Sequence, residues 1–115
     1  MATKLMLTEL LGMDGQPIKD SADRERSVTL RTVVVGALLM PDERASMAQK
    51  LDRAILADLC RRRGNPKLTS ADVETIKEAV ARFMPPIVLF RVCELLDPNS
   101  VEYREPGEDG EEAEA

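Results

Sequence analysis

The clearest helix boundaries in the chain lie in residues 68–96, LTSADVETIKEAVARFMPPIVLFRVCELL. Thr69 is followed three residues later by Asp72. The Thr69 hydroxyl can therefore accept a hydrogen bond from the Asp72 amide, while the Asp72 carboxylate accepts one from the Thr69 amide. This reciprocal cap predicts the start of a helix over residues 70–84.

Two successive prolines separate this helix from the next. Neither Pro85 nor Pro86 can donate a backbone hydrogen bond, and the ring of Pro85 disfavours helical angles at the residue before it. Pro86 also suits the first turn of a further helix, predicted over residues 86–96. The apolar positions expected to face inward in these two helices are Val73, Ile76, Val80, Phe83, Val88, Leu89, Val92, Cys93 and Leu96.

The longest helix is predicted over residues 42–63. Asp42 is the expected N-cap, and Gly64, preceded by three arginines, marks the expected end in the C′ position. Residues at helical spacing along one side predict a one-sided amphipathic helix. These residues are Met47, Leu51, Ala54, Ile55, Asp58 and Leu59.

The most buried helix is expected over residues 30–40, with Thr29 as its N-cap. Its β-branched run at residues 33–35 has poor helix propensity, so a buried strand is the competing interpretation for residues 30–36. Helix is slightly favoured. The helical face would be formed by Leu30, Val33, Val34, Ala37 and Leu38.

A small hairpin is predicted over residues 5–20. Asp14 and Gly15 both tolerate positive φ, which is typical of a two-residue turn between short strands. Pro17 cannot donate to a ladder, so the second strand should be brief and at an edge. Residues 4–11 fit either a strand or an initial helical turn.

Charge divides the chain in two. Of its 21 acidic and 16 basic residues, eight acidic and one basic lie in residues 97–115, which gives this segment a net charge of −7 and the rest +2. Residues 99–115 bury too little apolar surface to offset their ordering entropy and are expected to form a disordered acidic tail. The predicted fold class is mainly α, with four helices and the hairpin in one globular domain, residues 1–98.

Residues that active sites commonly use are scarce. The chain has no His, which excludes a nucleophile paired with a His base, a His metal cluster and a His pH switch. Cys60 and Cys93 lie far apart in apolar settings and are expected to be buried thiols. No glycine-rich phosphate loop is present, and the acids around Asp14 lack the spacing of a calcium loop. We therefore expect a non-enzyme without cofactor or metal.

One basic concentration could contact nucleic acid or another anion with salt-dependent affinity. It consists of Arg53, Arg61, Arg62, Arg63 and Lys67. The favoured interpretation is that these are cations near a helix C-terminus that interact with the helix dipole. The scarcity of aromatic residues also argues against base stacking, so nucleic acid is a disfavoured partner that the sequence does not exclude.

The chain is expected to be cytoplasmic. Its first residues lack the apolar core of a signal peptide, and no apolar stretch approaches the roughly 18 residues of a membrane span. Three features could form an interaction surface: the acidic tail, the six methionines and the hairpin arm. Each has a plainer interpretation: the tail could be a solubilising extension, the methionines could fill the core, and the hairpin arm could cover the helices.

Several stretches together resemble a group of small proteins encoded by tailed bacteriophages and prophages. They are Leu10-Leu11-Gly12-Met13-Asp14-Gly15-Gln16-Pro17-Ile18-Lys19-Asp20, Leu30-Arg31-Thr32-Val33, Leu68-Thr69-Ser70-Ala71-Asp72 with Ile76-Lys77, and Pro85-Pro86-Ile87-Val88. The resemblance spans most of residues 5–96 and concerns turns, caps and apolar positions. It carries over no site residues, and the acidic tail has no counterpart. It implies a phage-derived cytoplasmic protein without known chemistry, such as a tail-assembly helper.

The predicted function is that of a non-catalytic phage or prophage interaction protein in tail or head–tail assembly, acting in the bacterial host cytoplasm. It would bind a phage structural protein through apolar helix surface and the hairpin arm. Two other classes stay open: a small nucleic-acid-binding regulator that uses the basic concentration, and an inhibitor whose acidic tail mimics nucleic acid. The sequence leaves the partner's identity and self-association undetermined.

Overall fold

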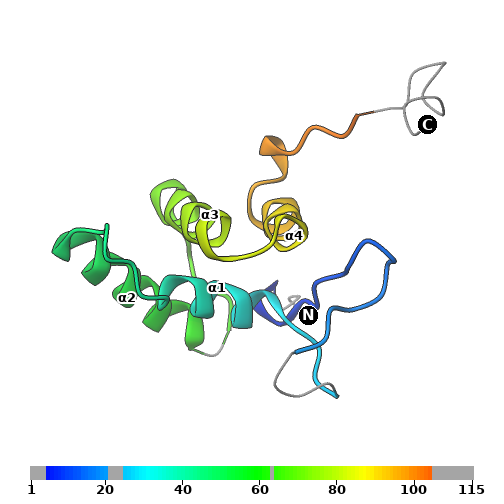
Figure 1. Ribbon diagram of the computed structural model, residues 1–115, viewed down its shortest axis with the longest axis horizontal. Helices are drawn as coiled ribbons and strands as arrows, with labels where there is room; N and C mark the ends of the chain where they lie inside the picture. Colours follow the sequence, from blue (N-terminus) through cyan, green and yellow to red (C-terminus); the bar gives the residue numbers. More distant parts are fainter. Residues whose placement is uncertain (1–4, 21–24, 63, 105–115) are drawn as a thin grey trace.

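The computed structural model describes residues 5–20, 25–62 and 64–104 of the 115-residue chain. Four α-helices dominate this part of the chain, and no β-strand occurs in it. The helices are α1 (Leu30–Leu38), α2 (Met47–Arg61), α3 (Ser70–Phe83) and α4 (Pro86–Leu96), with 3-10 turns at Leu5–Leu7 and Pro98–Ser100 (Figure 1). The prediction of a mainly helical fold with four helices is confirmed.

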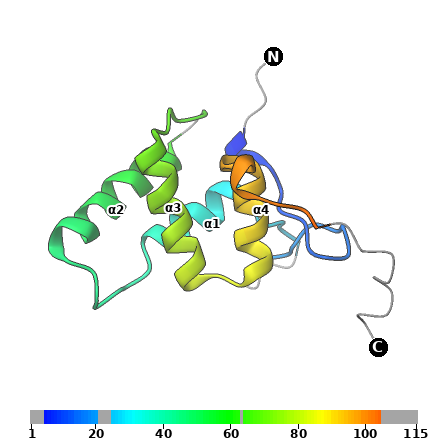
Figure 2. The same cartoon turned by 90° about the horizontal axis from the view of Figure 1, so that it is seen from above.

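Helix α1 is the central element. It packs against α2, α3 and the first 3-10 turn, whereas α4 packs on α3 and the second 3-10 turn. Figure 2 shows α3 and α4 side by side, with α1 behind them. Leu30, Val34 and Ala37 of α1 are completely buried. Residues 30–36 belong to this helix and do not form the buried strand that the sequence left open. The face predicted to point inward does so.

The local signals at three helix starts are present in the structure. The Thr29 hydroxyl accepts a hydrogen bond from the amide of Thr32 at 3.3 Å. The Thr69 amide donates to the Asp72 carboxylate at 3.0 Å, and the Asp72 amide donates to the Thr69 hydroxyl at 3.1 Å. Pro86 begins α4. These caps place α3 and α4 within one residue of their predicted bounds.

Helix α2 starts five residues later than predicted, and Asp42 is not its N-cap. Ser46 is the N-cap: its amide donates to the side chain of Gln49 at 2.8 Å, and the Gln49 amide donates to its hydroxyl at 3.1 Å. Asp42 instead accepts hydrogen bonds within the preceding loop and from more distant arginines. The helix ends at Arg61 with Arg62 as the cap, so Gly64, at φ 90°, lies beyond the C′ position predicted for it.

The orientation of α2 is the main departure from the sequence-based expectation. An amphipathic helix normally buries its apolar stripe, but α2 turns Met47, Leu51 and Ile55 to solvent. It buries the opposite side, whose members are Leu56, Ala57 and Cys60. Apolar residues occupy both sides of this helix, and the small Ala57 and Cys60 allow closer packing against α1.

The N-terminal region consists of extended segments joined by isolated bridges. Residues 8–12, 16–20 and 26–30 each pair with the other two, through the antiparallel bridges Glu9–Thr29, Leu11–Pro17 and Lys19–Ser27. Gly15 has φ 79° in the expected turn, where the Gly12 amide donates to Gln16 O at 2.9 Å. A two-stranded hairpin over residues 5–20 is not shown, because a third segment joins the pairing. The 3-10 turn at Leu5–Leu7 leads into the first of these paired segments.

Part of the predicted acidic tail is in contact with α4. The ring of Tyr103 packs edge-on against Phe90, with centroids 6.0 Å apart, and its hydroxyl donates to Glu94. Residues 105–115, on which the prediction of a disordered tail mainly falls, lie outside the described residues. Within the described ranges, no helix is both long and apolar enough to span a bilayer.

Candidate functional site

The most prominent surface feature is an apolar row on the outer side of α2. Met47, Leu51 and Ile55 are 84%, 59% and 60% exposed. Four-residue spacing brings them to one side of the helix, and we call them the outer row. Isolated apolar residues are common on protein surfaces, but contiguous ones mark interaction sites.

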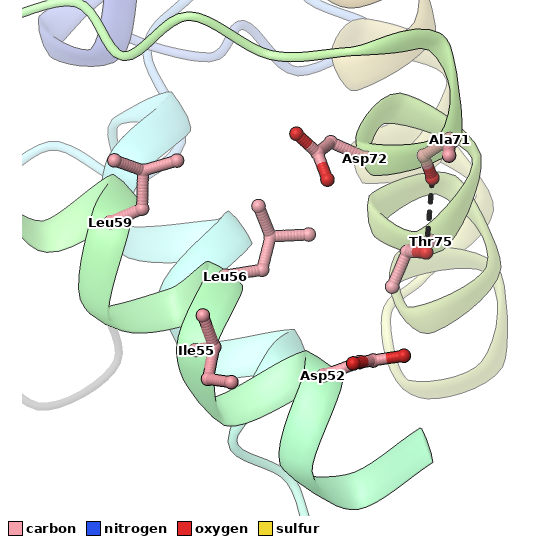
Figure 3. Close-up of a pocket in the computed structure, with 7 residues that line it drawn as sticks. All are labelled: Asp52, Ile55, Leu56, Leu59, Ala71, Asp72 and Thr75. Carbon is pink, nitrogen blue, oxygen red and sulfur yellow. Dashed lines mark hydrogen bonds between the residues drawn. The ribbon is translucent and has the colours of Figure 1, made fainter. Parts of the chain in front are cut away.

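A groove adjoins the outer row between α2 and α3. It has a volume of about 410 Å³, and its lining residues are Asp52, Ile55, Leu56 and Leu59 from α2 and Ala71, Asp72 and Thr75 from α3. Figure 3 shows the two helices as opposite walls, with Leu56 between them. Ile55 belongs to both features, so the outer row continues into the groove.

A second hollow lies on the other side of α2, next to the loop that follows α1. Its volume is about 300 Å³, and Leu39 and Pro41 of the loop line it together with Lys50 and Ala54 of α2. Leu39 is exposed, as is the adjacent Met40. Apolar surface therefore extends from the groove across the outer side of α2 to this loop.

Arg31 of α1 fixes the C-terminal end of α2. Its Nε donates to Cys60 O at 3.0 Å, and its Nη2 donates to Arg62 O at 3.0 Å and to Gly64 O at 3.2 Å. The last carbonyls of a helix have no partner within the helix. Arg31 supplies this partner, so α2 is held on α1 while its other side stays exposed.

Asp42 holds the N-terminal half of α2 in a similar way. Its carboxylate binds Arg53 of α2 at 3.0 Å and Arg82 of α3 at 3.2 Å, and its side chain is only 5% exposed. The Arg53 hydrogen bond is the main cause that holds the pKa of Asp42 below its ordinary value, against the opposing effect of burial. The loop, α2 and α3 are thereby joined at one point.

The residues of the predicted basic concentration have different environments. Arg61 and Arg62 lie together on Asp58, at 2.7 and 2.6 Å. Their hydrogen bonds, with that of Arg62 the stronger cause, lower the pKa of Asp58. Arg53 is held apart from them by Asp42. Lys67 is exposed in the connection before α3, and Arg63 is outside the described residues.

The thiols and acidic side chains that the structure describes form no cluster suited to a metal. The described ranges contain no group of three or more Cys, Asp or Glu residues arranged to hold an ion. Cys60 is buried, and burial raises its pKa to about 11, so it is a protonated thiol at neutral pH. Cys93 is also a free thiol but is only partly buried.

Comparison with protein-family models, with curated protein sequences and with solved structures gives no match to this chain. The candidate site is therefore defined by geometry. The sequence already contained its main signal, the four-residue apolar spacing in α2. It gave no sign that this side would face solvent, or that Arg31 would hold the opposite side in place.

Proposed function

We propose that this chain is a non-catalytic protein-binding module that uses the outer side of α2 to hold another protein during phage virion assembly. The observation that carries the proposal is the exposure of Met47, Leu51 and Ile55 in one row. The virion context is supported by the sequence resemblance to small phage and prophage proteins, and the partner we propose is a phage structural protein.

Burying the outer row would provide a substantial driving force. Full burial of one Leu, Ile or Met side chain contributes roughly 1.5–3 kcal/mol. Leu51 and Ile55 lie on a helix that Arg31 holds at its C-terminal end and Asp42 holds near its middle, through Arg53, so little conformational entropy is lost when a partner binds. A helix that packs along such a row is a common recognition mode.

The N-terminal segments are less suited to the strand addition expected of a hairpin arm. Leu10 receives a hydrogen bond from Ile18 and donates one to Val28, and the Val28 amide donates to Ile18. Each segment already pairs with the other two through isolated bridges, and the described residues contain no regular strand whose edge a partner strand could extend. The proposal therefore places the interface on α2.

The test is co-expression with structural proteins encoded in the same phage or prophage genome. We expect a stable complex with the unchanged chain and its loss in the Leu51→Gln/Ile55→Gln variant. Met13→Gln is a control, because Met13 is even more exposed, at 78%, but far from α2 in the chain. Binding to duplex DNA that falls steeply with salt, without any protein complex, would instead favour the regulator and overturn the proposal.

A further inference from the structure

The groove between α2 and α3 combines an apolar floor with acidic walls. Leu56 is 6% exposed at the floor, and Ile55 and Leu59 flank it. Asp52 lies on the α2 wall and Asp72 on the α3 wall, and Figure 3 shows the Asp72 carboxylate on the side facing α2. An occupant would therefore meet apolar surface and two carboxylates together.

The charge of these two carboxylates is not neutralised within the described part of the chain. Neither Asp52 nor Asp72 has an ion pair there, although one oxygen of Asp72 accepts from the Thr69 amide. The negative charge of Asp72 acts with burial to raise the pKa of nearby Cys60. The arginines of α2 and its C-cap are bound elsewhere, Arg53 to Asp42 and Arg61 and Arg62 to Asp58.

From this arrangement we propose that the groove binds a basic amphipathic helix of the partner protein. Its apolar side chains would contact Ile55, Leu56 and Leu59, and a Lys or Arg would bind between Asp52 and Asp72. An α-helix with its side chains is roughly 10–12 Å across, so the groove takes the side chains of one face while the helix lies along the outer row. This inference rests on the proposed function and specifies the chemistry of the partner.

The charges of the chain favour a different protein over a second copy. Every basic residue of the four described helices except Lys50 already binds an acidic side chain or a backbone carbonyl within the described chain. A second copy would thus offer almost no free helical cation to the groove. The chain's own residues 105–115 carry only acidic charges and would be repelled.

The test uses the full chain and synthetic helical peptides with one leucine face and flanking Lys residues. We expect the Lys peptide to bind, with amide shift changes at residues 52–59 and 71–75 in ¹⁵N NMR spectra. A peptide with Glu in place of Lys should not bind. The Asp52→Asn/Asp72→Asn variant should bind the Lys peptide roughly tenfold more weakly, because each charge-assisted contact is replaced by a neutral one. The amide oxygen introduced by Asp72→Asn can still accept the capping hydrogen bond from Thr69.

Glu9→Gln/Glu102→Gln is the matched control, since it removes two exposed negative charges outside the groove. One set of results would overturn the proposal of a basic partner and keep the proposed function. In it, the Lys and Glu peptides bind equally, Asp52→Asn/Asp72→Asn has no effect on binding, and Leu51→Gln/Ile55→Gln loses binding. Lys-peptide binding that moves no amide of residues 52–59 or 71–75 would also overturn it. So would a dimer of the unchanged chain that dissociates in Leu51→Gln/Ile55→Gln.

Discussion

Arg31 and Cys60, 29 residues apart, are joined by a 3.0 Å hydrogen bond from the guanidinium Nε to the backbone carbonyl. The same guanidinium binds the carbonyls of Arg62 and Gly64. One side chain of α1 therefore ends α2 and fixes the connection to α3. This arrangement determines which side of α2 meets the core and which side meets solvent.

Replacing Arg31 should destabilise the protein. In Arg31→Ala three carbonyls lose a charged donor, and we expect the free energy of unfolding in urea to fall by about 2 kcal/mol. Arg31→Lys should recover only part of this loss, because an ammonium cannot reproduce the planar fork. Arg44→Ala, at an exposed position, is the control. An unchanged urea midpoint in Arg31→Ala would contradict the proposed capping role.

The orientation of α2 is testable by stability alone. Leu51→Gln and Ile55→Gln should each change the free energy of unfolding by no more than about 0.5 kcal/mol, as is usual for exposed positions. Leu56→Ala, in the buried side, should cost about 2–5 kcal/mol. The opposite ranking, measured by urea unfolding, would show that the outer row is in the core.

Asp42 should make stability depend on pH in the acid range. Its pKa is lowered in the folded protein by Arg53, so its contribution is complete above the ordinary carboxyl value of 3.8 and is lost as the pH falls through the lowered value. Asp42→Asn should therefore be less stable than the unchanged chain at pH 7, and the difference should shrink below pH 3.8. A difference in unfolding free energy that stays constant from neutral pH to well below the lowered pKa would contradict the ion pairs.

The two thiols should react at different rates. Burial keeps Cys60 protonated, with a pKa of about 11, while Cys93 is partly exposed. In the native protein at pH 8, we expect a disulfide reagent to modify Cys93 first and Cys60 only on unfolding in urea. The Cys93→Ala variant isolates the slow thiol. Fast native modification of that variant would show that Cys60 is accessible.

Local signals in the sequence predicted α1, α3 and α4 well, because the caps of α1 and α3 depend on residues three positions apart and the start of α4 depends on two successive prolines. The reciprocal bonds of Thr69 and Asp72 are an example. For α2 the predicted N-cap is Asp42, whereas the observed one is Ser46. The choice between them depends on Arg53 and Arg82, which draw Asp42 into contacts across the fold.

The candidate site can be predicted from the sequence only in part. The spacing of Leu51 and Ile55 is visible in the sequence, but periodicity cannot say which of two apolar sides of a helix is buried. That choice follows from packing against α1 and from Arg31, whose acceptors are backbone carbonyls. Since every residue has a carbonyl, nothing in the sequence identifies the ones that Arg31 binds. The groove with Asp52 and Asp72 depends on the relative placement of two helices and was not predicted.

Leu51 and Cys60 belong to the same helix but lie on opposite sides of α2, one exposed and one buried. If the proposed function holds, selection for folding and selection for recognition act largely on separate residues of a single helix. The outer row can diversify toward new partners without loss of the fold. In a deep mutational scan, substitutions on the buried side of α2 would lower cellular abundance, and substitutions in the outer row would lower partner binding. The two effects would alternate along residues 47–61 with the period of an α-helix.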